Sequence, residues 1–199
     1  MLYTIFRLAL ILIFKIFFRF QVFGKKHIPK QGGFILASNH ASYLDPLALG
    51  VACSRKLSYM ARHDLFLNPV FSWLLPKIRA FPVKRYSSDP AALKEAMRRL
   101  KDGQILVLFP EGSRRANGLS QEVEAGVGFL SAKLDVPVIP AFIKGTQIAL
   151  PKGARFIRPA KVSVHFGRQV SIERRGVPYQ DIARNVMEEI RHLACSELD

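Results

Sequence analysis

Two short polar segments follow directly after apolar runs, and this placement constrains the fold more than any other feature of the chain. His40 and Asp45 follow the apolar run at residues 34–37, and Glu111 follows the run at residues 105–109. Apolar runs of this length are typical of buried strands, and an α/β sheet places its polar site residues where such strands end. A base beside an orienting acid, near arginines that can hold a phosphate, indicates group transfer onto a phosphorylated acceptor.

The spacing of His40 and Asp45 predicts a turn between them. On a continuous helix the two side chains would lie about 140° apart and would not meet. Pro46 disfavours the helical conformation at Asp45 and is common in the first turn of a helix, so Asp45 is predicted to be an N-cap. A turn over residues 40–44 lets the carboxylate reach one imidazole nitrogen and leaves the other as a general base. The alternative is that Asp45 only caps a helix and His40 is an ordinary turn residue.

Four sequence blocks resemble those of a known enzyme family. Asn39-His40-x4-Asp45 and the segment Phe-Pro-Glu-Gly-Ser-Arg at residues 109–114 resemble the first and third blocks of the glycerolipid acyltransferases, in particular the 1-acylglycerol-3-phosphate (lysophosphatidate) acyltransferases. Residues 78–85 and 136–140 resemble the second and fourth blocks. A serine replaces the usual threonine of the third block, and Lys84 stands where the second block often has an aspartate. The second departure leaves the identity of the acceptor open.

The resemblance also implies roles for individual residues. His40 and Asp45 would be catalytic, and the acceptor would be bound by Arg85, Glu111, Gly112, Ser113 and Arg114. Glu111 repels a phosphate, so we expect it to orient an arginine or a glycerol hydroxyl, with a structural ion pair as the alternative. The acyl group would arrive as a thioester on coenzyme A or acyl carrier protein. Thiolate is a good leaving group, so we expect no cofactor, and no cysteine–histidine spacing resembles a zinc site.

A net charge of +15 requires an anionic partner for this chain of 199 residues. The candidates are nucleic acid, a membrane surface and a phosphorylated substrate. A basic nucleic-acid-binding module would explain the charge, but the sequence has no recognition-helix or RNA-sheet signature, so we expect no nucleic-acid partner.

The N-terminal segment predicts contact with a membrane. Residues 2–23 are mostly apolar, but Arg7, Lys15 and Arg19 interrupt them and fall, with Thr4, within a helical arc of roughly 120°. A basic stripe on an apolar helix is typical of a helix lying in the bilayer interface, where anionic lipid would be its partner. A spanning helix remains an alternative, although Lys15 would be costly at depth. A long core helix is a second alternative, which fits poorly with the three charges.

Strands and helices alternate in the rest of the sequence. Strands are predicted near 34–38, 56–60, 80–84, 104–109, 136–143 and 161–166, and helices near 46–53, 90–101, 120–134 and a C-terminal segment with Ile182, Val186, Ile190 and Leu193. This order predicts an α/β fold with a mixed central sheet flanked by helices. We expect a membrane-anchoring helix over residues 1–23 and an acyltransferase domain over residues 24–199. Residues 64–75 are apolar and aromatic, which suits either core or a lipid-facing rim.

Together these features predict a membrane-associated acyltransferase on the cytoplasmic face of the membrane, with the bacterial inner membrane as its expected location. Its reaction would convert 1-acylglycerol-3-phosphate to phosphatidic acid. Another lysolipid, such as a lyso-ornithine lipid, is an alternative acceptor. A lysophospholipid hydrolase is a second alternative, which would use the same base on water and release free fatty acid.

Overall fold

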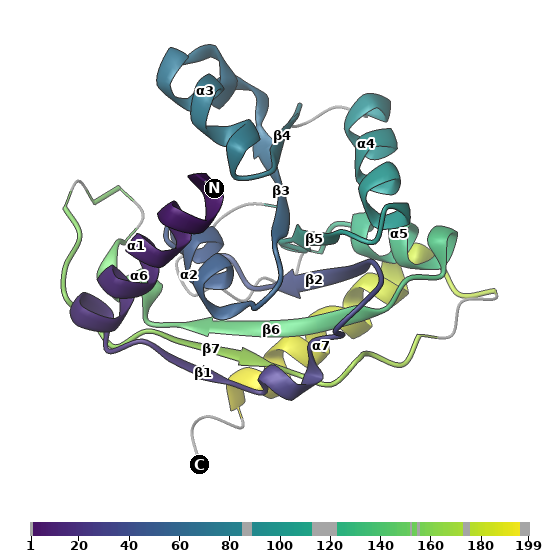
Figure 1. Cartoon of the computed structure of the whole chain (residues 1–199). Coiled ribbons are helices and arrows are strands. Elements are labelled where there is room, and N and C mark those ends of the chain that lie inside the picture. Colours follow the sequence, from purple (N-terminus) through teal and green to yellow (C-terminus); the bar gives the residue numbers. More distant parts are fainter. Residues whose placement is uncertain are drawn as a thin grey trace.

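A single seven-stranded sheet organises the part of the chain that the structure describes, which is residues 2–84, 89–112, 123–151, 153, 154, 156–172 and 176–195 of a computed structural model. The strand order is β1-β7-β6-β2-β5-β3-β4 (Figure 1). The strands are β1 (Gln21–Phe23), β2 (Phe34–Ser38), β3 (Leu57–Arg62), β4 (Ala80–Val83), β5 (Ile105–Leu108), β6 (Val138–Lys144) and β7 (Ser163–Phe166). Strands β6, β2, β5, β3 and β4 run parallel, whereas β7 is antiparallel to β6 and parallel to β1. The predicted mixed sheet is confirmed.

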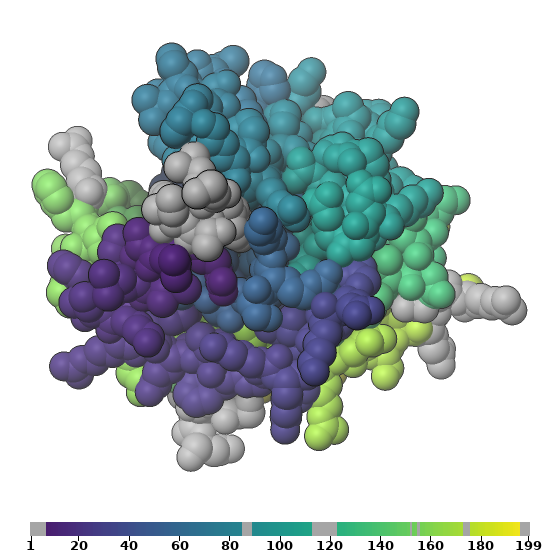
Figure 2. Space-filling view, in the orientation of Figure 1, coloured from purple at the N-terminus to yellow at the C-terminus, as the bar shows by residue number. Residues whose placement is uncertain are grey.

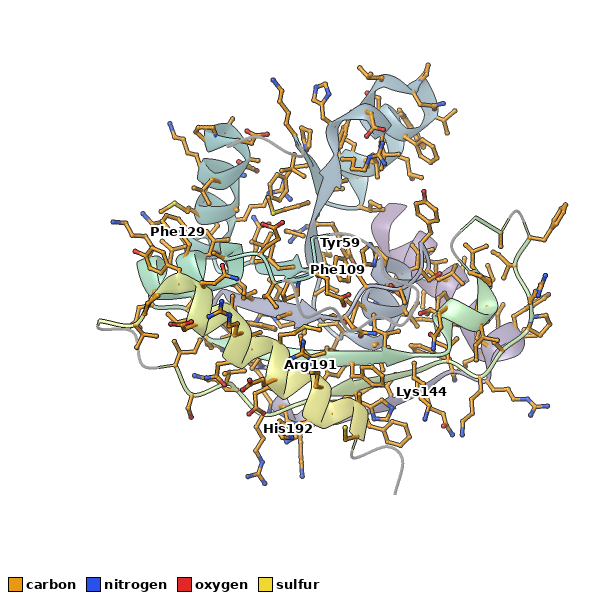
Figure 3. The ribbon with its side chains drawn as sticks, turned by 180° about the vertical axis from the view of Figure 1, so that it is seen from behind. Tyr59, Phe109, Phe129, Lys144, Arg191 and His192 are labelled. Carbon is orange, nitrogen blue, oxygen red and sulfur yellow. The ribbon has the colours of Figure 1, made fainter. Side chains whose placement is uncertain are left out.

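Helices cover both faces of the sheet. They are α1 (Leu2–Phe18), α2 (Asp45–Ala52), α3 (Pro69–Lys77), α4 (Pro90–Lys101), α5 (Gly126–Leu134), α6 (Thr146–Ala149) and α7 (Tyr179–Cys195), with the 3-10 helices η1 (Lys25–His27) and η2 (His63–Leu67). Side chains alternate along β2, so Phe34 and Leu36 pack with α1 and α2, while Ile35 and Ala37 pack with α4, α5 and α7. Helix α7 lies across the face that carries Ile35 and Ala37, and this face is nearest the viewer in Figure 3. The predicted flanking helices are confirmed.

Helix α1 is shorter than predicted and belongs to the core. The sequence predicts a helix to residue 23, but α1 ends at Phe18 and Gln21–Phe23 form strand β1. The helix ends because Arg19 is left-handed (φ 42°) and the Phe18 carbonyl accepts a hydrogen bond from the Val162 N–H at 2.9 Å, which leads the chain into the sheet beside β7. Phe14 and Phe18 are 1% and 2% exposed. The segment is therefore packed into the domain.

Arg7 does not belong to the predicted basic stripe. Its guanidinium donates from Nε to the Gly50 carbonyl at 3.1 Å and from Nη2 to the Cys53 carbonyl at 2.7 Å, both at the C-terminal end of α2. These carbonyls have no partner within their helix, so a cation there is favourable. Lys15 and Arg19 are exposed as predicted. Within the described ranges, no helix has the length and hydrophobicity needed to cross a bilayer.

The aromatic segment at residues 64–75 is not core. It forms the end of η2 and most of α3, and neither element contains a buried residue. Leu67, Val70, Phe71 and Trp73 are exposed, and α3 projects from the body of the molecule (Figure 1). A lipid-facing role for this segment stays a prediction. The helix predicted near 120–134 is present as α5 from Gly126, and residues 120–122 lie outside the described ranges.

Candidate active site

The carboxyl ends of three neighbouring strands meet at one edge of the sheet. Strand β2 lies between β5 and β6, and all three run parallel. His40 follows β2 by two residues, Glu111 follows β5 by three, and Thr146 follows β6 by two. Ligands bind outside the carboxyl ends of parallel strands in such sheets, which makes this edge the candidate active site.

Asn39 fixes the chain immediately before His40. Its side-chain Nδ2 donates to the Ile143 carbonyl at 3.0 Å, and its Oδ1 accepts from the Ile143 N–H at 2.8 Å. The amide thus extends the pairing of β2 with β6 by one step past the end of β2. Asn39 is buried, and this pair of hydrogen bonds sets the position from which His40 leaves the sheet.

His40 and Asp45 form the predicted pair. His40 Nδ1 lies 2.9 Å from Asp45 Oδ2, and Asp45 is 0% exposed. A carboxylate accepts only, so Nδ1 carries the proton and donates it. The same Oδ2 accepts from the backbone N–H groups of Ala41 at 2.7 Å and Ser42 at 2.8 Å. The turn over residues 40–44 therefore wraps around the carboxylate.

Asp45 is not the predicted N-cap. It is the first residue of α2, and the residue at the N-cap position is Leu44, which makes no side-chain capping bond. The carboxylate is turned back toward residues 40–42 instead, where two N–H groups and an imidazole offer more donors than the helix end. The reading in which Asp45 only caps the helix is excluded by this geometry.

Phe109 holds the imidazole from its ring face. The two rings stack with their centroids 4.1 Å apart and their planes at 19°. The His40 side chain is 13% exposed, and no residue in the described ranges hydrogen-bonds its Nε2. Nε2 is thus the nitrogen available to a substrate, in a ring fixed at Nδ1 and on one face. Phe109 follows β5 and lies by the sheet end in Figure 3.

Glu111 joins the first and third blocks. Its Oε1 accepts the backbone N–H of His40 at 3.0 Å, and the residue is 4% exposed. Gly112 closes the turn, since its N–H donates to the Phe109 carbonyl at 3.0 Å. Its φ of 63° lies in the left-handed region that favours glycine, and an added Cβ would lie 2.9 Å from the Glu124 side chain. Glu111 holds the backbone of His40, a role that the sequence did not predict.

The predicted arginines and serine lie outside the described ranges. These residues are Arg85, Ser113 and Arg114. Lys84, the last described residue before Arg85, borders a cavity of about 460 Å³ between η2, β4 and α4. Strands β5 and β3 separate β4 from β2, so β4 lies roughly 14 Å from the strand that leads to His40. Acceptor binding by Arg85 and Arg114 stays a prediction.

Thr146 belongs to the site and was missed from the sequence. Its Oγ1 donates to Asp45 Oδ1 at 2.5 Å, from the first residue of α6. The signal in the sequence was the first hydroxyl after the fourth block, but using it requires knowing that β6 lies beside β2. Ser42, in contrast, is occupied: its Oγ donates to the Leu150 carbonyl and accepts from the Leu44 N–H. Within the described residues, no cluster of three or more His, Cys, Asp or Glu side chains could hold a metal.

Comparisons with known proteins find related sequences and a related fold. The family model described as Acyltransferase matches residues 19–144. A 1-acyl-sn-glycerol-3-phosphate acyltransferase of Bacillus subtilis is 30% identical over 148 residues, which are 74% of this chain and 71% of that protein. A chloroplastic 1-acyl-sn-glycerol-3-phosphate acyltransferase of Brassica napus is 28% identical over 71% of this chain, but the chain spans only 42% of its length. The crystal structure of the 1-acyl-sn-glycerophosphate acyltransferase of Thermotoga maritima superposes with a TM-score of 0.79 at 24% identity, covering 99% of this chain and 82% of that one.

Proposed function

The chain belongs to the Acyltransferase family, and from that premise we propose that it moves a fatty acyl group from a thioester onto the free hydroxyl of 1-acylglycerol-3-phosphate, giving phosphatidic acid. The observation that carries this proposal is the His40–Asp45 pair at the shared edge of β2, β5 and β6. The names of the Bacillus and Brassica relatives support the choice of acceptor.

The geometry supports direct transfer with His40 as the base. Nε2 removes the proton from the acceptor hydroxyl while the oxygen attacks the thioester carbonyl. Asp45 holds the protonated imidazole through the 2.9 Å contact to Nδ1. The tetrahedral intermediate then expels the thiolate, which takes the proton back from His40. No covalent enzyme intermediate is needed, and the two bonds of Ser42 Oγ argue against Ser42 as a nucleophile.

Several backbone donors near the base are already used. The N–H groups of Ala41 and Ser42 donate to Asp45, that of His40 donates to Glu111, and that of Gly112 donates to the Phe109 carbonyl. These four groups do not form an oxyanion hole. Other hydrogen-bond donors stabilise the developing oxyanion, either backbone N–H groups or side chains that bind the substrate.

Acceptor binding falls to the basic residues of the second and third blocks. Arg85 and Arg114 are proposed to hold the phosphate, because a guanidinium fork matches a phosphomonoester and the chain has a large positive charge. Glu111 accepts a hydrogen bond from the backbone N–H of His40. We therefore assign it to holding the base and not to binding the glycerol hydroxyl. The acyl donor is coenzyme A or acyl carrier protein thioester, with no separate cofactor.

Membrane association follows from the exposed face of α1. Phe14 and Phe18 face the core, whereas Leu8, Leu12 and Ile16 are exposed on one face at a spacing of four residues. Lys15 on the same exposed side can meet anionic lipid headgroups. In Figure 2 the segment lies on the surface as a purple ridge. We propose that α1 lies in the headgroup interface on the cytoplasmic side of the membrane. In a bacterium this membrane would be the inner membrane.

One assay tests the proposal against its two alternatives. Purified protein on anionic vesicles is given an acyl thioester with lysophosphatidate, a lyso-ornithine lipid, another lysophospholipid or no acceptor, and products are identified by mass. Phosphatidic acid as the main product supports the proposal. Acylation of a different lysolipid overturns the acceptor assignment, and free fatty acid from lysophospholipid without acylated product indicates the hydrolase.

A further inference from the structure

Asp45 receives a hydrogen bond from outside its own segment, and that bond comes from Thr146. Three of the four donors to the carboxylate lie within residues 40–42, and all three bond Oδ2. The fourth, Thr146 Oγ1, bonds Oδ1 at 2.5 Å from 101 residues away. Both Asp45 and Thr146 are 0% exposed. Among the described residues, Thr146 is therefore the one donor to the second carboxylate oxygen.

The start of α6 is built to put this hydroxyl in place. Gly145 has a φ of 92°, and a Cβ on it would lie 1.9 Å from the Lys161 carbonyl, so only glycine allows the turn out of β6. The Leu150 N–H bonds the Thr146 carbonyl, and the Leu150 carbonyl accepts from Ser42 Oγ at 2.8 Å. Helix α6 thus contacts the His40 turn at both of its ends.

We infer that Thr146 is a positioning residue for the base, acting through Asp45. Its hydroxyl fixes the rotation of the carboxylate, so that Oδ2 faces Nδ1 and Nε2 is aimed at the acceptor hydroxyl. Without it, Oδ1 is a buried oxygen with no partner, and the carboxylate turns to share its remaining donors. His40 then loses its fixed orientation while the substrate-binding residues are untouched. This inference rests on the proposed function for its kinetic readout and on the geometry alone for its spectroscopic one.

The kinetic test compares Thr146→Val, which keeps the shape and removes the donor, with Thr146→Ser, which keeps the donor. Thr146→Val should lower kcat roughly ten- to a hundredfold, the range for a hydrogen bond to a charged group, with the KM for either substrate changed by less than about threefold. Thr146→Ser should restore most of the rate. Ser131→Ala is the matched control, because Ser131 is equally buried and bonds the Gly128 carbonyl in α5, away from His40.

A double-mutant cycle separates positioning from a general structural effect. In an Asp45→Ala background Thr146 has no side-chain oxygen to bond at position 45, so Thr146→Val should cost less than about threefold further. An equal loss in both backgrounds, or full activity in a folded Thr146→Val protein, overturns the inference.

A readout without substrate keeps this inference distinct from the proposed function. In protein labelled with ¹⁵N-histidine, the hydrogen-bonded Nδ1 proton of His40 should give a resolved signal that exchanges faster with water in Thr146→Val and is retained in Thr146→Ser. An unchanged signal in a folded Thr146→Val protein overturns the inference even if no acyl transfer is found. Loss of transfer in the unaltered protein, with the signal behaving as expected, overturns the proposed function alone.

Discussion

The backbone N–H of His40 donates to Glu111 Oε1 at 3.0 Å, and this bond joins the ends of two neighbouring strands. His40 follows β2 and Glu111 follows β5, 71 residues later in the chain. The carboxylate of the third block therefore holds His40 of the first block through the backbone. On the other side of β2, Thr146 acts on Asp45 from the end of β6. The His40–Asp45 pair is held from both neighbouring strands.

Replacing Glu111 should affect turnover more than acceptor affinity. Glu111→Ala leaves the partly buried His40 N–H without its acceptor, which costs about 1 kcal/mol of stability and displaces the proposed base. We expect kcat to fall at least about tenfold with the acceptor KM changed less than about threefold. Steady-state kinetics and thermal melting of Glu111→Ala, with Glu188→Ala on the exposed side of α7 as control, check this. A rise in acceptor KM with kcat intact would return Glu111 to the glycerol-binding role.

Replacing the proposed phosphate ligands should give the opposite pattern. Arg85→Ala and Arg114→Ala should each lower kcat/KM for the acceptor roughly ten- to a hundredfold, the range for a charge-assisted hydrogen bond, and spare the KM for the thioester. Lysine at either position should recover part of the loss, since it lacks the bidentate fork. Kinetics with acceptor and thioester varied separately provide the measurement. A variant that weakens thioester binding alone places that arginine on the donor.

Membrane binding should depend on the outer face of α1. Gln at Leu8, Leu12 and Ile16 removes exposed apolar surface without touching Phe14 or Phe18, so vesicle partitioning should fall more than tenfold while the melting temperature is retained. Lys15→Gln should weaken binding to anionic vesicles more than to neutral ones, and added salt should reduce the difference. Deletion of residues 1–23 is a poor test, because it also removes β1 and two core phenylalanines.

The alternative site of membrane contact is the surface formed by η2 and α3. Gln at Leu67, Val70 and Trp73 serves as the matched variant, since these side chains are also exposed. Loss of vesicle binding in this variant and not in the α1 variant would place the anchor on α3.

The contact of Arg7 with α2 should control the reactivity of Cys53. Burial raises the pKa of the Cys53 thiol, so at pH 8 a smaller fraction is thiolate than for an ordinary cysteine. Cys195 is exposed, and it should react first with a thiol reagent. Arg7→Gln removes two hydrogen bonds at the end of α2 and should speed the labelling of Cys53 alone by exposing the thiol. This exposure should outweigh the loss of the Arg7 charge, which by itself lowers the Cys53 pKa. Mass spectrometry over time measures the labelling of Cys53 and Cys195. Equal Cys53 labelling rates in the unaltered protein and in Arg7→Gln would contradict a protective contact between Arg7 and α2.

The local part of the architecture could be predicted from the sequence. Apolar runs identify β2 and β5, and Asp89 before Pro90 marks the start of α4, where the Asp89 side chain accepts from the Ala92 N–H. The His40–Asp45 contact also follows from local geometry, because Pro46 and the short spacing require a turn. The predicted capping role of Asp45 failed because the nearby imidazole and N–H groups compete for the same carboxylate.

The features that were predicted wrongly or missed depend on contacts between residues that are distant in sequence. Nothing in residues 21–23 distinguishes a strand from the end of an apolar helix, and β1 exists because β7 pairs with it. The sequence alone favours a contact of Arg7 with lipid headgroups, because it does not show that α2 ends beside Arg7. Glu111 was predicted as a site residue, but its contact with His40, like that of Thr146 with Asp45, exists only because β5 and β6 flank β2. Strand order in a sheet is set by tertiary packing, and a single sequence does not reveal it.

The central claim is that His40 is the general base of acyl transfer, and turnover of His40→Ala tests it most directly. The measurement is kcat with a long-chain acyl thioester and lysophosphatidate on vesicles, alongside circular dichroism to confirm folding and His192→Ala, an exposed histidine on α7, as control. The account predicts a fall of roughly 10²–10⁴ for His40→Ala, a severe loss for Asp45→Asn and no change for His192→Ala. A folded His40→Ala protein with near-normal turnover would contradict it.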